Sequence, residues 1–190
     1  TTMACNLALA SAQTKRTVLI DGDMSQSQLP GRMLLTPGQP GLTNVLSGTL
    51  ELDEAFCAAP DSSLLVLPVG DQMPAGAGEI FLSEAFHDLL GQLSERFEVI
   101  IIDSPPVELV GDALALAPLA TTTVLAIKAG ITPVNAVRRT IARLKRSGAM
   151  SIQGVLSFAE PTRDSHGYYR EPEPGQQPQA EVRLLTDRQG

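Results

Sequence analysis

Three aspartates stand where short apolar segments end. Asp21 and Asp23 follow residues 17–20 in TVLIDGD, and Asp103 follows residues 99–102 in VIIID, before two prolines. Continuously apolar segments of this length are typical of buried parallel strands, and ligands of open α/β sheets bind beyond the carboxyl ends of such strands. An isolated Asp-Gly-Asp is more often a solvated turn. A second strand that also ends in aspartate favours carboxylates that converge on one cation.

The elements that must position these carboxylates alternate along the chain. The sequence predicts strands at residues 17–20, 64–67, 99–103, 122–127 and 152–157. It predicts helices at residues 2–13, 42–46, 79–93, 112–116 and 133–147, and a loop rich in Pro and Gly at residues 30–41. Such alternation specifies an α/β fold, a doubly wound and mostly parallel sheet with helices on both faces. This fold normally has a strand before its first helix, so we expect the chain to be truncated at its N-terminus.

Composition narrows the class of protein. The chain has 190 residues, 43% of them hydrophobic, and a formal net charge of -7, which fits one globular domain and argues against nucleic-acid binding. The sequence contains no apolar run of membrane-spanning length, and its first ten residues lack a basic segment, so we expect neither a membrane span nor a signal peptide. Cys5 and Cys57 fall in separate predicted elements, as expected for a protein of a reducing cytoplasm. The basic residues of the helix at 133–147 predict a solvated or partner-facing surface.

The last part of the chain differs in composition from the rest. Residues 160–190 are rich in Pro, Glu, Gln and Arg and poor in apolar residues, which predicts a flexible tail after a domain of residues 1–159. The tail contains Tyr168 and Tyr169, the only tyrosines in the sequence. Two tyrosines in a tail can be accidental, or they can be acceptors of a modification.

Six segments, in order, resemble one family. They are TTMACNLALASAQTKRTVLIDGDM, GLTNVLSG, LLVLPVG, VIIIDSPPVELVGDALALAP, TTVLAIKAG and GVLSF. Together they resemble the bacterial tyrosine kinases (BY-kinases) of capsule and exopolysaccharide assembly, P-loop proteins related to the MinD and ParA ATPases. The resemblance covers residues 1–158.

The resemblance implies a site for ATP and Mg²⁺. Thr1 and Thr2 would end a Walker A motif whose glycines and lysine lie upstream, and the Thr1 hydroxyl would bind Mg²⁺. Taken alone, these threonines would be an ordinary helix cap. Asp21 and Asp23 would be the Walker A′ aspartates and Asp103 the Walker B aspartate, acting mainly through metal-bound water. Asp23 would assist metal placement, and Asp21 would accept the tyrosine proton.

The same resemblance implies a function. The family phosphorylates tyrosines in the C-terminal tail of a neighbouring subunit of a ring, which would make Tyr168 and Tyr169 the acceptors. The chain would be an autophosphorylating tyrosine kinase that regulates exopolysaccharide polymerisation and export at the inner face of the plasma membrane. Its partners would be a transmembrane co-polymerase (a chain-length determinant) or an upstream domain of that kind, further copies of itself and a tyrosine phosphatase.

Two parts of the sequence depart from the family's pattern. Residues 25–27 are Ser-Gln-Ser where the family usually has Arg-Arg-Pro, so fixed positive charge is missing. Phe158 stands where the family usually has the asparagine that recognises the base, and its ring could stack on adenine. Two other functions therefore stay open. One is an ATPase switch of the MinD and ParA kind, without kinase activity; the other is a catalytically weakened scaffold of the export machinery.

Overall fold

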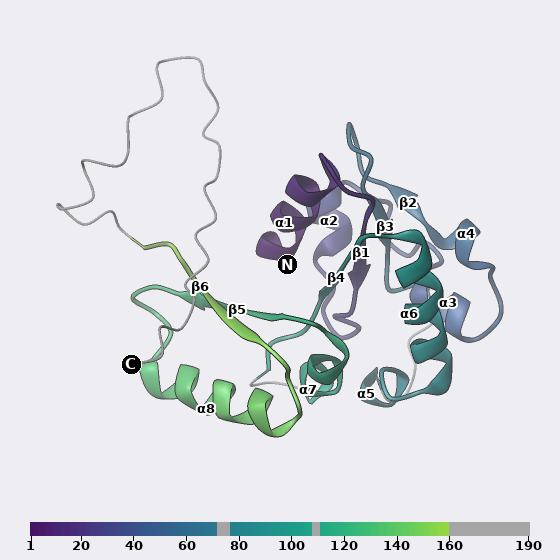
Figure 1. The fold of residues 1–190 in the computed structure, drawn as a ribbon. Coiled ribbons are helices and arrows are strands. Elements are labelled where there is room, and N and C mark those ends of the chain that lie inside the picture. Colours follow the sequence, from purple (N-terminus) through teal and green to yellow (C-terminus); the bar gives the residue numbers. More distant parts are fainter. Residues whose placement is uncertain (72–76, 108–110, 160–190) are drawn as a thin grey trace, which may run out of the picture. The chain divides into compact units, whose positions relative to one another are not determined.

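The computed structural model describes residues 1–71, 77–107 and 111–159 in two compact units, residues 1–116 and residues from 117 onward. The first unit contains a four-stranded sheet in the order β2-β3-β1-β4 (Figure 1). Its strands are β1 (Thr17–Asp21), β2 (Cys57–Ala58), β3 (Leu65–Leu67) and β4 (Val99–Asp103). Strands β3 and β4 pair in parallel with β1, and the short β2 pairs antiparallel with β3. The prediction of an α/β fold built on a parallel sheet is confirmed.

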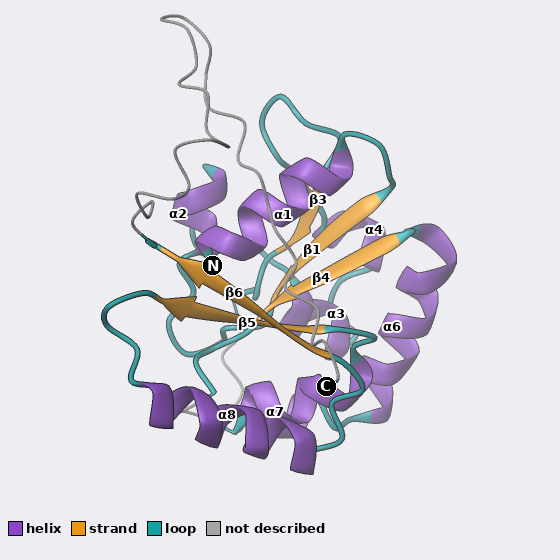
Figure 2. Cartoon of the chain, turned by 60° about the vertical axis from the view of Figure 1, so that its left-hand side comes forward, coloured by secondary structure: helices purple, strands orange, loops and turns teal. Residues whose placement is uncertain are grey.

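Helices cover both faces of this sheet (Figure 2). Helices α1 (Thr2–Ala12) and α2 (Leu29–Met33) pack on one face, where Leu19 and Val66 join their buried side chains in one hydrophobic cluster. Because successive residues of a strand point to opposite faces, Val18 and Ile20 point to the other face. Helix α6 (Glu84–Arg96) lies there and contacts β4. All five residues of β1 are buried, as the continuous apolar pattern predicts.

The structure corrects two of the predicted elements. The predicted loop at 30–41 begins with α2, because Pro30 occupies the first turn, where a missing N–H breaks no helical hydrogen bond. The helix predicted at 79–93 is two helices, α5 (Ala77–Ile80) and α6. Ser83 separates them and caps α6 by accepting a hydrogen bond from Phe86 N, 3.2 Å away.

Three short helices complete the first unit. They are α3 (Leu42–Leu46), α4 (Leu52–Ala55) and α7 (Asp112–Leu116). The sequence predicts α3 and α7 with these bounds, but it misses α4 and the two-residue strand β2. Both missed elements are shorter than a reliable periodic pattern.

The second unit is a parallel strand pair joined through a helix. It consists of a 3₁₀ turn (Ala117–Leu119), β5 (Thr123–Lys128), α8 (Val134–Arg146) and β6 (Ile152–Ser157). Six residues of β5 pair in register with six of β6. Ala136, Thr140 and Leu144 form the buried stripe of α8. Within the described residues, no helix is both long enough and apolar enough to cross a membrane.

Candidate active site

The aspartates at the ends of β1 and β4 lie side by side. Asp21 and Asp103 are register partners in the parallel ladder, and Gly22 N donates a hydrogen bond to the carbonyl oxygen of Asp103 across 2.7 Å. A Cβ at position 22 would lie 2.7 Å from that oxygen, so only glycine allows this close approach. The two strands therefore deliver two carboxylates to one edge of the sheet.

Asp21 is fully buried at this edge. The Ser27 hydroxyl donates a hydrogen bond to its Oδ2, and Asp23 N donates one to its Oδ1 across 3.3 Å. Burial raises the pKa of Asp21 to about 6, while these two hydrogen bonds oppose the shift. The negative charges of Asp103 and Asp23 add to the rise in this pKa. A carboxyl with such a pKa can exchange a proton near neutral pH, as a general base must.

Asp23 holds the turn that follows β1. Its Oδ1 accepts hydrogen bonds from Ser25 N (3.2 Å), Ser25 Oγ (2.8 Å) and Gln26 N (3.0 Å). Asp23 is buried but 9% exposed, slightly more than the fully buried Asp21. One oxygen of this carboxylate is thus committed to backbone geometry.

Asp103 faces the start of α1. The main-chain nitrogen of Thr1 lies 3.1 Å from its Oδ1, and the Thr1 side chain makes no capping hydrogen bond. The other oxygen of Asp103, Oδ2, is buried and has no hydrogen-bond partner among the described residues. Buried polar atoms are nearly always satisfied, so an orphaned carboxylate oxygen indicates a ligand position. Thr2 is the first residue of α1 and is exposed.

The oxygen atoms of Asp103 and Thr1 match the ligands of one type of cation site. The described residues contain no group of three or more His, Cys, Asp or Glu side chains that could hold a metal ion by themselves. Mg²⁺ in nucleotide sites needs no such cage, because it takes one or two protein oxygens and completes its shell with phosphates and water. The orphaned Asp103 Oδ2 beside Thr1 fits that kind of site.

A polar loop lies at the end of β3, next to β1. Asn44 accepts hydrogen bonds on Oδ1 from Gly41 N and Asp71 N, and its Nδ2 donates to Asp71 Oδ1 across 2.7 Å. Gly70 has φ of 111°, and a Cβ there would lie 2.2 Å from the Thr43 hydroxyl. The GLTNVLSG segment therefore fixes the loop that follows β3 through hydrogen bonds and close packing.

Sequence reasoning missed the two serines of the site. The replacement of the family's arginines by Ser25 and Ser27 predicts only a loss of positive charge. In the structure both hydroxyls bond to carboxylates, Ser25 to Asp23 and Ser27 to Asp21. The Asp-x-Ser spacing signals the first of these contacts as a local turn. Nothing in the spacing signals the second, which spans six residues.

The remaining predicted site residues belong to other parts of the chain. Phe158 lies in the second unit, is 79% exposed and has φ of 57°. The Lys128 ammonium lies 4.8 Å from the centre of its ring. Tyr168 and Tyr169 lie outside the described residues.

The chain is similar to known bacterial kinases. The tyrosine-protein kinase CpsD of Streptococcus agalactiae is 31% identical over 169 residues, which make up 88% of this chain and 73% of that protein. The chain belongs to the family of bacterial tyrosine-protein kinases. The tyrosine-protein kinase wzc of Salmonella typhimurium is 31% identical over 159 residues, 82% of this chain and 21% of that protein. No protein-family model matches the chain.

Solved structures place this kinase among P-loop folds. The kinase domain of VpsO superposes with a TM-score of 0.77 and 34% identity over 81% of this chain and 75% of that domain. Cobyrinic acid a,c-diamide synthase from Mycobacterium smegmatis, crystallised with an ATP analog and magnesium, has a TM-score of 0.64. It is 23% identical over 82% of this chain and 68% of its own, which shows a shared fold alone. The resemblance found in the sequence, and the fold it implies, are thus confirmed.

Proposed function

We propose that this bacterial tyrosine kinase transfers phosphate from ATP to tyrosines of its own C-terminal tail and thereby regulates exopolysaccharide or capsule polymerisation and export. The observation that supports this most directly is the pairing of Asp21 with Asp103 at one edge of the sheet. One of these carboxyls has a pKa near neutrality, and the other has a buried oxygen without a partner. A kinase site needs both a proton acceptor and a metal position.

Each residue of the site then has a role. ATP would supply the phosphoryl group, and Mg²⁺ would supply positive charge to neutralise its phosphates. Asp103 and the Thr1 hydroxyl would hold the metal, assisted by Asp23. The Thr2 N–H, at the start of α1, would bind phosphate together with Thr1 at the N-cap position, because a helix N-terminus attracts anions.

Asp21 acts as the proton acceptor in this proposal. Its pKa of about 6 leaves it mostly ionised at neutral pH and still basic enough to take the proton of a tyrosine hydroxyl during transfer. Asp23 is the weaker candidate for this role, because three hydrogen bonds from residues 25–26 occupy one of its oxygens. Its slightly greater exposure than that of Asp21 suits metal placement.

Tyr168 and Tyr169 are the proposed acceptors, phosphorylated by a neighbouring subunit of a ring. Each phosphate adds roughly 1.5 to 2 negative charges, so modified tails repel one another and weaken the ring. A tyrosine phosphatase would reverse the change. A transmembrane co-polymerase would hold the kinase at the inner face of the plasma membrane, as a separate chain or as an upstream domain. The matched region makes up 73% of CpsD but 21% of wzc. These shares are compatible with a co-polymerase that is a separate chain and with one that is an upstream domain.

Phe158 is the proposed contact for the adenine of ATP. An exposed ring can stack on a base. Lys128 already lies over this ring, and the two together would present a cationic, aromatic surface to the nucleotide.

The proposal is tested with the full-length protein that contains this chain. Incubation with Mg-ATP is predicted to place phosphotyrosine on residues 168 and 169, and the double variant Y168F/Y169F is predicted to lose most of the signal. ATP hydrolysis without any phosphotyrosine would instead support an ATPase switch. Failure to bind ATP at all would support a scaffold.

A further inference from the structure

Charge is divided unevenly along the chain. Residues 117–159 contain six Lys or Arg and no Asp or Glu, whereas residues 1–116 contain four Lys or Arg and fifteen Asp or Glu. A protein with a net charge of -7 thus carries one region without a single acidic side chain. Such asymmetry is typical of a surface that binds an anionic partner.

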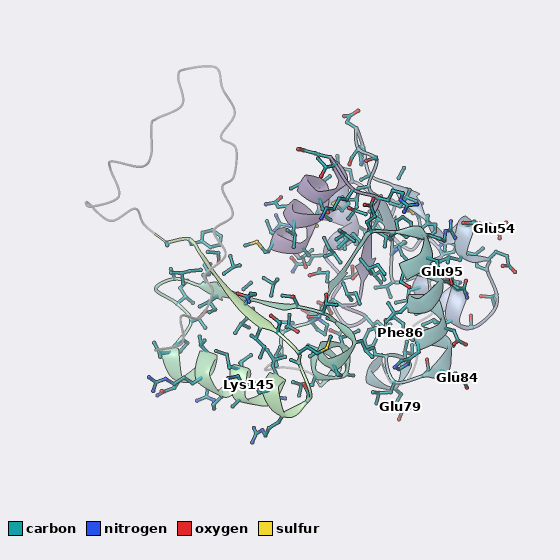
Figure 3. All side chains as sticks on the ribbon, viewed as in Figure 1. Glu54, Glu79, Glu84, Phe86, Glu95 and Lys145 are labelled. Atoms are coloured by element: carbon teal, nitrogen blue, oxygen red, sulfur yellow. The ribbon has the colours of Figure 1, made fainter. Side chains whose placement is uncertain are left out.

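Helix α8 concentrates this positive charge on its outer face. Residues 136, 140 and 144 face inward. Arg138, Ala142 and Lys145 therefore lie on the opposite, outward face, spaced about one helical turn apart, and Arg146 lies next to Lys145. These three basic side chains are exposed and form no ion pair within the described residues. Figure 3 labels Lys145 on α8, where nitrogen-tipped side chains point away from β5 and β6.

Exposed apolar side chains lie at both ends of the helix. Ile131 and Val134 at its start are each 66% exposed, and Met150 after its end is 68% exposed. Val134 lies one turn before Arg138 on the outer face. Arg138 thus lies in the first half of the helix, and Lys145 and Arg146 lie in its last turn, with exposed apolar side chains before and after them.

We propose that this α8 surface, formed by Ile131, Val134, Arg138, Lys145, Arg146 and Met150, binds the anionic headgroups of a lipid bilayer. The cations pair with lipid phosphates, and the apolar side chains enter the interface between headgroups and acyl chains. This contact adds a lipid-binding function to the chain and does not depend on phosphoryl transfer. It would orient the kinase on the membrane beside its partner.

Charge and apolar content together favour lipid over DNA. A duplex of DNA offers phosphates but no apolar layer for Ile131 and Met150. A second copy of the chain offers the acidic residues 1–116, and the experiment must separate this case. Vesicles test the lipid directly.

The experiment measures co-sedimentation of the full chain with vesicles of phosphatidylcholine alone and of phosphatidylcholine with one quarter phosphatidylglycerol, at 50 to 300 mM NaCl. Binding is expected only with phosphatidylglycerol and is expected to weaken with salt. The variant R138Q/K145Q/R146Q is expected to bind about 100-fold less tightly, from roughly a five-fold loss per cation. The variant I131S/M150S is expected to bind more weakly than the wild type at 300 mM NaCl, because salt screens the charges and apolar contacts then supply most of the affinity.

A matched control separates the surface from net charge. Q13E/T36E/Q92E changes the net charge by the same amount at exposed positions of the first unit and is expected to bind like the wild type. Equal binding by the wild type and R138Q/K145Q/R146Q would overturn the proposal, as would equal loss in the control. The proposal would also be overturned if neither the wild type nor any variant bound vesicles. Loss of self-association by R138Q/K145Q/R146Q in sedimentation velocity, or loss of DNA binding, would then identify the other partner. Thermal unfolding and tyrosine phosphorylation without vesicles are expected to stay unchanged, which shows that the variants are folded.

Discussion

Asp21 and Asp103 occupy the same level of adjacent parallel strands, and the Gly22 amide reaches over to the Asp103 carbonyl. This single relationship brings together Asp21, the proposed proton acceptor, and Asp103, the proposed cation ligand. Because β1 is buried along its whole length, the carboxylate of Asp21 at its end is removed from water by the fold itself. The site is therefore a consequence of strand pairing, and its properties can be tested through that pairing.

The close approach at Gly22 predicts a cost for any side chain there. G22A is expected to lower the free energy of unfolding by about 1 to 3 kcal/mol, since the new methyl meets backbone oxygen of Asp103 that cannot move away. Urea denaturation measures this. G31A is the control, because a methyl at that helical position meets nothing and is expected to stabilise slightly. Equal stability of G22A and the wild type would contradict the packing described.

Ser27 is predicted to lower the pKa of Asp21, the proposed base. Its hydrogen bond lowers the pKa of Asp21, so S27A is expected to raise that pKa further, by about one unit. The acidic limb of the pH profile of tyrosine phosphorylation would then move to higher pH. S25A is the comparison, because Ser25 bonds to Asp23 and not to Asp21. An unmoved profile for S27A, or the same movement for S25A, would remove Ser27 from this role.

Buried Asp21 also predicts how stability depends on pH. Its folded pKa of about 6 lies above the ordinary value of 3.8, so between these values the folded state binds more protons than the unfolded state. Stability contributed by protonated Asp21 is therefore present below about pH 4 and is lost as pH rises through 6. D21N is expected to be more stable than the wild type at pH 8, by about 3 kcal/mol, with the gap closing near pH 4.

Urea denaturation at several pH values measures this gap. D53N is the control, because Asp53 is an exposed partner of Arg96 and surface pairs contribute little. A difference between D21N and the wild type that is independent of pH would show that Asp21 is not the titrating group.

Much of this arrangement follows from sequence pattern. Apolar segments of four or five residues predict β1 and β4, and the aspartates that end them predict the edge at which they meet. Pattern does not predict α2, since Pro30 normally signals a break and is tolerated here only by its place in the first turn. Nor does it predict the capping of α6 by Ser83, which depends on one hydrogen bond. The Ser27 contact with Asp21 arises from the tertiary path of a loop, which no periodicity encodes.

In the proposed mechanism, the carboxylates at the ends of β1 and β4 form a magnesium and ATP site used for tyrosine phosphorylation. The most direct measurement is the rate of phosphotyrosine formation by the full-length protein against Mg²⁺ concentration at saturating ATP, for the wild type, D103N and D53N. D103N is expected to lose about 100-fold or more in rate and to need more Mg²⁺, while D53N is expected to match the wild type. A D103N variant with the rate and Mg²⁺ dependence of the wild type would contradict the account.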